Sequence, residues 1–441
     1  MTGSEMLNPT TLALSETSSP LPPGSAGESV FRPVQYLGCK LRVLDAIISL
    51  AREVALPEGG AIDLFSGSTV VSQAFAASGF RTTSVDAQAY SRVFAQALLG
   101  IDRSIGREVD TNALLREAES LTSRDSQWIA IAQQEFELIE RASATALRAL
   151  EARLPLSWRQ GRLEADVDAP LTSFYAGSYF GVRQALQLDA IGSAIASPNL
   201  GLDAWQRATA KTALMHAASH VVHSAGKHFA QPLKMRTGNA TFHDRRFLAD
   251  RAIDVSKVFR EACAKIASIA PQRDGGHKAV TESAEQFVAK DDGASKLYYL
   301  DPPYTAQQYS RFYHVLETIA TETLPRLPIG YPPTTGLYPA ERYKSAFSSR
   351  RGAGKALSTV LSRLASLKAT AIISYSVSAR GSDGNARMIS LEELLAACRQ
   401  QFGRGHVEVV EFAHRYRQFN SGENANEDRD DKEVMVLCKS A

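Results

Sequence analysis

The chain has 441 residues, of which 44% are hydrophobic and 22% charged, which is the profile of a soluble globular protein with two or three domains. Its net charge of +2 excludes a generic polyanion binder, and the lack of an apolar run of about 18 residues excludes a membrane span. The four cysteines are scattered and form no C-x-x-C pair, which argues against a disulfide framework and a structural zinc site.

In chain order, the first segment, 1–30, is rich in Ser, Pro, Thr and Gly, and we expect a disordered tail rather than a signal peptide. Short apolar runs then alternate with segments of helical spacing. The runs "AIDLF" (61–65) and "TTSVD" (82–86) indicate strands, and helices are expected at 70–78 and 87–99. Such a β-α-β-α unit predicts a parallel sheet with helices on its faces.

Residues 100–290 interrupt this alternation, because their apolar positions repeat mostly at helical spacing, as at 125–154, 179–195 and 203–222. Beyond them we expect strands at 296–300, 369–376, 407–412 and 433–439, and helices at 309–323 and 391–402. The acidic stretch "SGENANEDRDD" indicates an exposed hairpin loop between the last two strands. The expected organisation is one α/β domain split into 31–100 and 291–441 by a helical insertion, 101–290, that contains the target-recognition region.

Positive charge gathers between Gly201 and Arg260, where ten Lys or Arg stand against four acids, and where five of the nine histidines also lie. A basic segment in a near-neutral chain indicates a nucleic-acid face, and a solvated helical surface is the alternative. His216 and His220 have the i, i+4 spacing of a metal pair, but no H-E-x-x-H pattern accompanies them, so we expect no metal site.

Two turns at predicted strand ends indicate a ligand. "DLFSGSTVVSQAF" begins at Asp63, where a strand meets a Gly-Ser turn and a helix, and Asp86 ends the next strand. In open α/β sheets ligands bind at the carboxyl ends of strands, and an acid there can accept hydrogen bonds from ribose hydroxyls. The spacing matches neither G-x-G-x-x-G nor a P-loop, which argues against a dinucleotide site or a triphosphate loop.

The stretch "LYYLDPPY" places Asp301 at the end of a buried strand. Two prolines fix the backbone there and remove two N–H donors, so the Asp301 carboxylate and the Pro302 carbonyl form a rigid set of acceptors suited to an amino group. Tyr304 adds a flat ring that can stack on a base. Upstream, "QYLGCK" contains Tyr36, which could pack on a cofactor, and Lys40, which could meet the carboxylate of that cofactor, although a helix lead-in is the simpler interpretation.

The order of "QYLGCK", "DLFSGST", Asp86, a long variable region and "LDPPY" resembles the D12 class of N6-adenine DNA methyltransferases, the Dam-like α-group. The resemblance covers about 100 residues in three blocks and weakens over 100–290. It implies a Rossmann-like class I methyltransferase sheet and S-adenosylmethionine as cofactor. One departure is Thr69, which stands where the family has the second glycine of D-x-F-x-G-x-G; a threonine there tightens the turn and weakens donor binding.

The resemblance also implies residue roles. Catalysis falls on Asp301, Pro302, Pro303 and Tyr304, and the cofactor set is Tyr36, Lys40, Asp63, Phe65, Ser66, Gly67, Asp86 and Asp301. For DNA contacts the basic middle offers Lys227, His228, Lys234, Arg236, Arg245 and Arg246. The implied reaction is methylation of adenine N6 in a specific duplex sequence, by base flipping and direct in-line transfer.

Three other functions stay open: methylation of cytosine N4, methylation of RNA or a protein amide, and non-catalytic DNA binding. The expected partner is duplex DNA, with a cognate restriction endonuclease or a phage-defence protein as a further candidate and no membrane. The expected location is the cytoplasm, where the protein of a prokaryote would associate with the nucleoid. The recognition sequence and the oligomeric state do not follow from the sequence.

Overall fold

The computed structural model describes residues 30–122, 126–233, 240–327, 336–339, 341–377, 387–412 and 432–440. Residues 1–29 of the predicted disordered tail, 1–30, and the predicted hairpin loop lie outside these ranges, whereas Val30 is described and buried. Within them, no helix is both long and apolar enough to cross a membrane.

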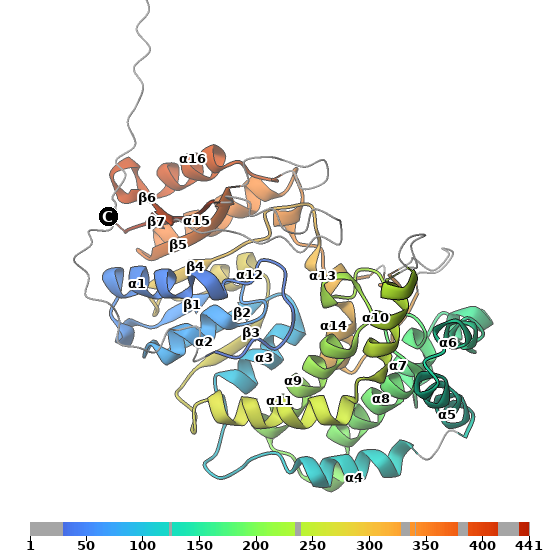
Figure 1. Cartoon of the computed structure of the whole chain (residues 1–441). Coiled ribbons are helices and arrows are strands. Elements are labelled where there is room, and N and C mark those ends of the chain that lie inside the picture. The colour runs from blue at the N-terminus through green and yellow to red at the C-terminus, as the bar shows by residue number, and fades with distance from the viewer. Residues whose placement is uncertain are drawn as a thin grey trace, which may run out of the picture.

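Seven strands of the described residues form one sheet in the order β3-β2-β1-β4-β5-β7-β6 (Figure 1). Their bounds are Ala61–Asp63 (β1), Thr82–Asp86 (β2), Lys278–Thr281 (β3), Leu297–Leu300 (β4), Thr370–Val377 (β5), Val407–Phe412 (β6) and Lys432–Cys438 (β7). The first five are parallel, whereas β7 runs antiparallel to both β5 and β6. The predicted parallel sheet and the predicted final hairpin pairing are therefore confirmed, and β3 is an additional strand that the sequence analysis did not anticipate.

Both faces of the sheet are covered, which explains the continuous apolar run of β4. Tyr298 and Leu300 pack with the layer that contains α12 (Ala284–Lys290), α15 (Ala353–Ser366) and α16 (Leu391–Phe402). Leu297 and Tyr299 point to the other face, toward α1 (Leu44–Val54) and α2 (Val70–Ala77). Because side chains alternate along a strand, four consecutive apolar residues supply both cores.

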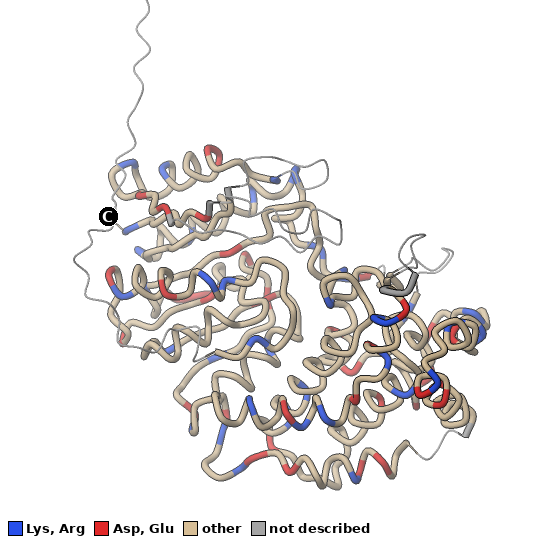
Figure 2. Tube along the Cα trace, viewed as in Figure 1, with Lys and Arg blue, Asp and Glu red and all other residues tan. Residues whose placement is uncertain are grey.

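A third, larger core lies among the helices of the middle part of the chain and also includes α3 (Ala89–Leu98), the helix that follows β2. Figure 1 shows these helices beside the sheet. They are α3 (Ala89–Leu98), α4 (Thr111–Thr122), α5 (Ser126–Glu140), α6 (Ala144–Glu151), α7 (Pro170–Tyr175), α8 (Val182–Ala196), α9 (Ala204–Val221), α10 (Ala240–Ala252), α11 (Val255–Ile269), α13 (Tyr309–Phe312) and α14 (His314–Thr321). Acidic and basic positions are interspersed along them, with no uninterrupted basic stripe in this view (Figure 2).

Two expected helices are each broken once. The segment 125–154 forms α5 and α6, which are separated near Ala142. This residue has a φ of 51°, a positive value that a right-handed helix cannot accommodate. The segment 309–323 forms α13 and α14, separated at Tyr313. In α14, Glu317 accepts hydrogen bonds from the backbone N–H groups of Ala89 and Tyr90 at 3.0 and 3.2 Å, so a carboxylate caps the start of α3. This contact ties the segment after β4 to the helix after β2.

Candidate active site

Three acids stand at the carboxyl ends of three neighbouring strands. Asp63 is the last residue of β1, Asp86 is the last of β2, and Asp301 follows β4 directly. The parallel register pairs Asp63 with Ser84 on one side and with Tyr299 on the other, so the strands end at one edge of the sheet. The structure therefore brings together the turns that the sequence analysis singled out.

A small cavity lies at this edge. It holds about 70 Å³ of free space, and its walls include Tyr36, Phe65, Asp86, Gln88 and Asp301. Pro303, Tyr309 and Tyr343 complete the wall on the side of the segment that follows β4. Residues from the first motif, both strand-end turns and the "DPPY" stretch thus share one cavity.

The glycine turn after β1 is pressed against the aromatic residue of the first motif. Gly67 has a φ of 49°, and a Cβ added there would lie 2.7 Å from the ring of Tyr36. Its N–H donates a hydrogen bond of 2.9 Å to Asp86 Oδ2. Tyr36 in turn stacks on Tyr313, with 4.7 Å between ring centroids and 8° between planes. Only glycine combines this backbone conformation with this approach.

Thr69 occupies a conformation that glycine would adopt more easily. It has a φ of 64° and is fully buried. Its hydroxyl donates to the Ser68 carbonyl at 2.7 Å, and the Gln73 amide donates to that same hydroxyl at 3.3 Å. A left-handed conformation costs a non-glycine residue about 1–2 kcal/mol, which explains why a glycine suits this position.

Asp63 and Ser66 lie behind the cavity rather than on its wall. Asp63 is 1% exposed; its Oδ2 accepts from Ser72 at 2.7 Å, and its Oδ1 has no hydrogen-bond partner among the described residues. Burial raises the pKa of Asp63 to about 7, against the opposing hydrogen bond from Ser72. Ser66 bonds to Ser91 and to the Val85 carbonyl. Both residues hold the turn that contains Gly67 and from which Phe65 reaches the cavity wall.

Asp86 holds the same turn from the neighbouring strand. Its second oxygen, Oδ1, accepts from the Gln88 N–H at 2.9 Å. Burial raises the pKa of Asp86 to about 6, although the backbone hydrogen bonds from Gln88 and Gly67 oppose the rise. Gln88 contributes a side-chain oxygen, Oε1, that is buried beside the cavity and accepts no hydrogen bond within the described residues.

Lys40 bridges two carboxylates. Its Nζ lies 3.2 Å from Asp301 Oδ1 and 2.5 Å from Glu433 Oε1, and the side chains of Lys40 and Glu433 are each only 10% exposed. Ser374 donates a further hydrogen bond of 2.7 Å to Glu433. Burial raises the pKa of Asp301 to about 6; the Lys40 ammonium opposes this rise and Glu433 adds to it. Asp301 is therefore largely ionised at neutral pH.

The rest of the "DPPY" stretch is locked to the neighbouring strand β5. Pro302 is buried, and Pro303 reaches the cavity wall. The Tyr304 hydroxyl donates to the Ser374 carbonyl, and its ring meets the edge of Tyr375 at 4.7 Å between centroids. The Tyr304 ring is thus held in place before any substrate arrives.

Four of the six residues predicted to contact DNA lie within the described residues, and two of these four, Lys227 and His228, contact other groups of the protein. Lys234 and Arg236 lie outside the described residues. The Lys227 ammonium contacts the His220 and Val222 carbonyls and Asp250, each at 3.0 Å, so protein oxygens surround it. His228 packs on Phe312, and burial lowers its pKa to about 4. Arg245 is exposed, and Arg246 donates to the Ser224 carbonyl at 3.2 Å.

Two site residues escaped the sequence analysis, Glu433 and Gln88. Glu433 stands at the start of the run "EVMVLC", directly after the acidic stretch "EDRDDK", so no local signal sets it apart from the exposed acids before it. Gln88 follows the strand-end acid Asp86 by two residues and has no distinctive pattern of its own. Phe312, an aromatic residue shortly after the "DPPY" stretch, is 5% exposed and belongs to the helical core, so it does not face the cavity.

A doubly covered, mostly parallel sheet with acids around a cavity at its carboxyl edge defines an α/β protein with a ligand site at the strand ends. Residues 253–327 match the family model described as D12 class N6 adenine-specific DNA methyltransferase. The match includes β4 and the "DPPY" stretch, and it confirms the family resemblance that the motifs indicated.

A curated relative agrees with this assignment. Modification methylase LlaI from Lactococcus lactis subsp. lactis is 32% identical over 142 residues, which are 32% of this chain and 20% of the relative. The chain thus spans about a fifth of the length of the curated relative that it matches.

Proposed function

We propose that this chain transfers a methyl group from S-adenosylmethionine to N6 of adenine in a specific duplex DNA sequence. The observation that carries the proposal is a partly buried, ionised carboxylate, Asp301, held at the end of β4 by the rigid "DPPY" stretch in the segment that matches the adenine methyltransferase family. In this proposal the sheet is the Rossmann-like class I methyltransferase sheet, whose reversed strand is β7.

The residues around the cavity suit the methyl donor. Gln88 Oε1 is a buried acceptor that has no partner among the described residues, and Asp86 lies beside it at a strand end, where a ribose would be bound. Gly67 lets a ligand or a ring approach the backbone closely. The free space of about 70 Å³ is below the 300 Å³ or more usual for ligand pockets, so binding requires wall side chains such as Tyr36 to move.

S-adenosylmethionine, when bound, supplies an electrophilic methyl group. The chain's own contribution centres on Asp301, which accepts a hydrogen bond from the exocyclic amine together with the Pro302 carbonyl. These acceptors return electron density to the nitrogen and stabilise the positive charge that grows on it as the new C–N bond forms. One amine proton leaves in the reaction, and ionised Asp301 is the nearest acceptor for it.

The two ion pairs of Lys40 also affect this step. Its ammonium already donates to Asp301, at the position that an amine substrate would take. Glu433 offers the ammonium an alternative partner 2.5 Å away, so Lys40 can remain paired while Asp301 receives the amine. Buried charges that lose their partner are costly, and Glu433 removes that cost.

The target base must leave the duplex to reach this cavity, at a cost of a few kcal/mol. Tyr304 supports this step, because its ring is already fixed by Ser374 and Tyr375 and stacking on it loses little side-chain freedom. The relative is a modification methylase, and on this basis we extend the proposal to a role in restriction and modification, with a cognate endonuclease as partner.

The test is incubation of the chain with labelled methyl donor and mixed-sequence duplex DNA, followed by mass spectrometry of the nucleosides. We expect N6-methyladenine from the wild type, and a loss of at least a hundredfold in Asp301→Asn, which keeps the shape but removes the charge. Asp168→Asn, at an exposed position in the helical part, is the matched control and should keep full activity.

The product decides between the alternatives. If the product is N4-methylcytosine, a methylated RNA or a methylated protein, the substrate is that molecule and the assignment to adenine N6 is wrong. Undiminished transfer by folded Asp301→Asn would refute the proposed catalytic role.

A further inference from the structure

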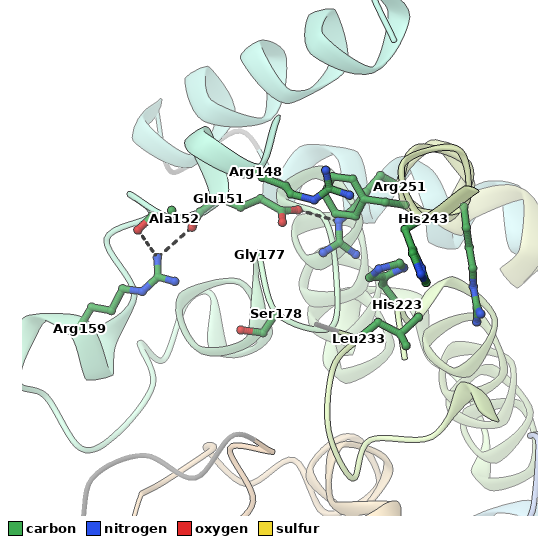
Figure 3. Close-up of a pocket in the computed structure, with 12 residues that line it drawn as sticks. Arg148, Glu151, Ala152, Arg159, Gly177, Ser178, His223, Leu233, His243 and Arg251 are labelled. Carbon is green, nitrogen blue, oxygen red and sulfur yellow. Dashed lines mark hydrogen bonds and ion pairs between the residues drawn. The ribbon is translucent and has the colours of Figure 1, made fainter. Parts of the chain in front are cut away.

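A second cavity lies in the helical part. It holds about 270 Å³ and is bounded by the end of α6, the loop before α8, the residues that follow α9, and α10. Four arginines contribute to its wall: Arg148, Arg159, Arg246 and Arg251. Figure 3 shows the Arg251 guanidinium between Glu151 and His223, with Arg159 on the opposite side of the hollow from them.

The cationic groups are held in place before any ligand binds. Arg251, only 1% exposed, pairs with Glu151 at 2.6 Å through Nε and donates to the Tyr179 carbonyl at 3.2 Å. Arg148 pairs with Asp244 at 2.6 Å. The ring of Phe247 packs against both guanidiniums, with centroid distances of 4.6 and 5.1 Å. Fixed orientation lowers the entropy that a ligand's binding would otherwise cost.

The wall also contains a histidine with a defined orientation. His223 Nδ1 lies 2.8 Å from Asp250 Oδ2, and the other oxygen of Asp250 accepts from Lys227 at 3.0 Å. Since the carboxylate selects the form with a proton on Nδ1, the Nε2 side of the ring is left for the cavity. Burial lowers the pKa of His223, although the hydrogen bond that its ring donates to Asp250 opposes this change.

Charge is not balanced around this cavity. The four arginines of the wall and the nearby Lys227 stand against four acids around them, Glu151, Asp244, Asp250 and Glu135, which leaves a surplus of one positive charge. Each guanidinium has five N–H groups, more than its contacts with the described residues use, and a guanidinium fork matches the oxygens of a phosphate. A cavity of this kind selects an anion rather than an apolar group.

A short chain of contacts links the cavity to the proposed active site. Tyr179, whose carbonyl receives Arg251, donates through its hydroxyl to the Phe229 carbonyl. The Phe229 N–H donates at 2.8 Å to the carbonyl of Phe312, in the helix α13 that follows the "DPPY" stretch. The cavity is therefore fixed relative to the segment that carries Asp301.

We infer that this cavity binds a backbone phosphate of the DNA substrate, an inference that rests on the function proposed above. Phosphate contacts of this kind position a protein on the duplex without reading its sequence. In this inference Arg246 contacts the DNA phosphate as part of the cavity wall. Arg148, Arg159 and Arg251, which the sequence analysis did not consider, are further phosphate contacts.

The experiment measures binding of the full chain to a fluorescent duplex oligonucleotide at several salt concentrations. Each lost phosphate contact lowers the slope of log K against log salt by about one. We expect this decrease for Arg246→Gln and for Arg159→Gln. Arg399→Gln, at an exposed position of α16 on the sheet, is the matched control and should retain the wild-type slope.

A second measurement uses inorganic phosphate alone, followed by ³¹P line broadening. We expect the wild type to broaden the signal and Arg246→Gln to do so less. If broadening depends on Arg246 but the DNA slope does not, the site serves a free phosphate compound and the DNA assignment is overturned. Wild-type slopes in both cavity variants also overturn it. Reduced slopes in a chain that transfers no methyl group would support this contact while refuting the proposed function.

Discussion

Replacing Glu433 by glutamine should shift the acid limb of methyl transfer to lower pH. Asp301 must be ionised to accept the amine, and burial together with Glu433 raises its pKa to about 6, with Lys40 opposing the rise. The substitution keeps the shape and the hydrogen bond from Ser374 but removes one negative charge. Protonation of Asp301 then becomes harder, so the variant should remain active at a pH where the wild type has lost half its rate.

The size of the shift follows from the two ion pairs of Lys40. Its Nζ lies 3.2 Å from Asp301 and 2.5 Å from Glu433, so the two carboxylate oxygens are no more than about 6 Å apart. At an effective dielectric constant of about 20, two unit charges at that distance interact by roughly 3 kcal/mol, or about two pK units. We therefore expect the midpoint to fall by about one to two pH units.

The assay is the single-turnover rate at saturating DNA and methyl donor between about pH 5 and pH 8, with unfolding curves to confirm that the variant folds. Glu408→Gln removes a similar charge from the adjacent strand, where Glu408 pairs with exposed Lys439 at 2.9 Å, and should leave the midpoint unchanged. An acid limb of Glu433→Gln that stays in place or moves to higher pH would refute the coupling between Glu433 and Asp301.

Asp63→Asn should have a free energy of unfolding about 2–4 kcal/mol higher than the wild type at pH 8 and equal to it near pH 4. Burial raises the pKa of Asp63 to about 7, so the wild type loses stability as pH rises between these values, whereas asparagine stays neutral. Equal urea midpoints at pH 8 would contradict this. Gly67→Ala should weaken donor binding tenfold or more by calorimetry, because its Cβ meets the Tyr36 ring at 2.7 Å, whereas Gly59→Ala meets nothing within 4 Å and should bind normally. Lys227→Met should lower the unfolding free energy by about 1–3 kcal/mol without changing the salt slope of DNA binding. An unchanged unfolding free energy together with a lower salt slope would instead show that Lys227 contacts DNA, as the sequence predicted.

The strands that carry the proposed site could be predicted because their signals are local. "KLYYL" is apolar on consecutive positions and ends in an acid and two prolines, and such a stretch has few structural solutions other than a buried strand end. In contrast, β3 was missed because its four residues are exposed or half-buried and follow a helical segment. An edge strand of that kind is specified by its pairing with β2, which no local pattern records.

Pairing between distant residues accounts for the other differences. Basic character alone suggested that Lys227 faces DNA, whereas the fold turns its ammonium onto the end of α9 and Asp250. Likewise, the role of Glu433 could not be predicted from the sequence, because its cation lies almost 400 positions earlier in the chain. Motifs indicate which residues matter, and only the fold indicates what a charged side chain contacts.

The bridge from Lys40 to Asp301 and Glu433 also bears on when the site exists. It unites a residue before β1, one after β4 and one on β7, the strand that comes last in chain order. Such non-local contacts form late, because the loops between them must close first. During synthesis, the carboxylate of the "DPPY" stretch can obtain its full set of partners only after β7 has emerged and inserted between β5 and β6. An incomplete chain would therefore hold the motif without the electrostatic setting that makes it competent.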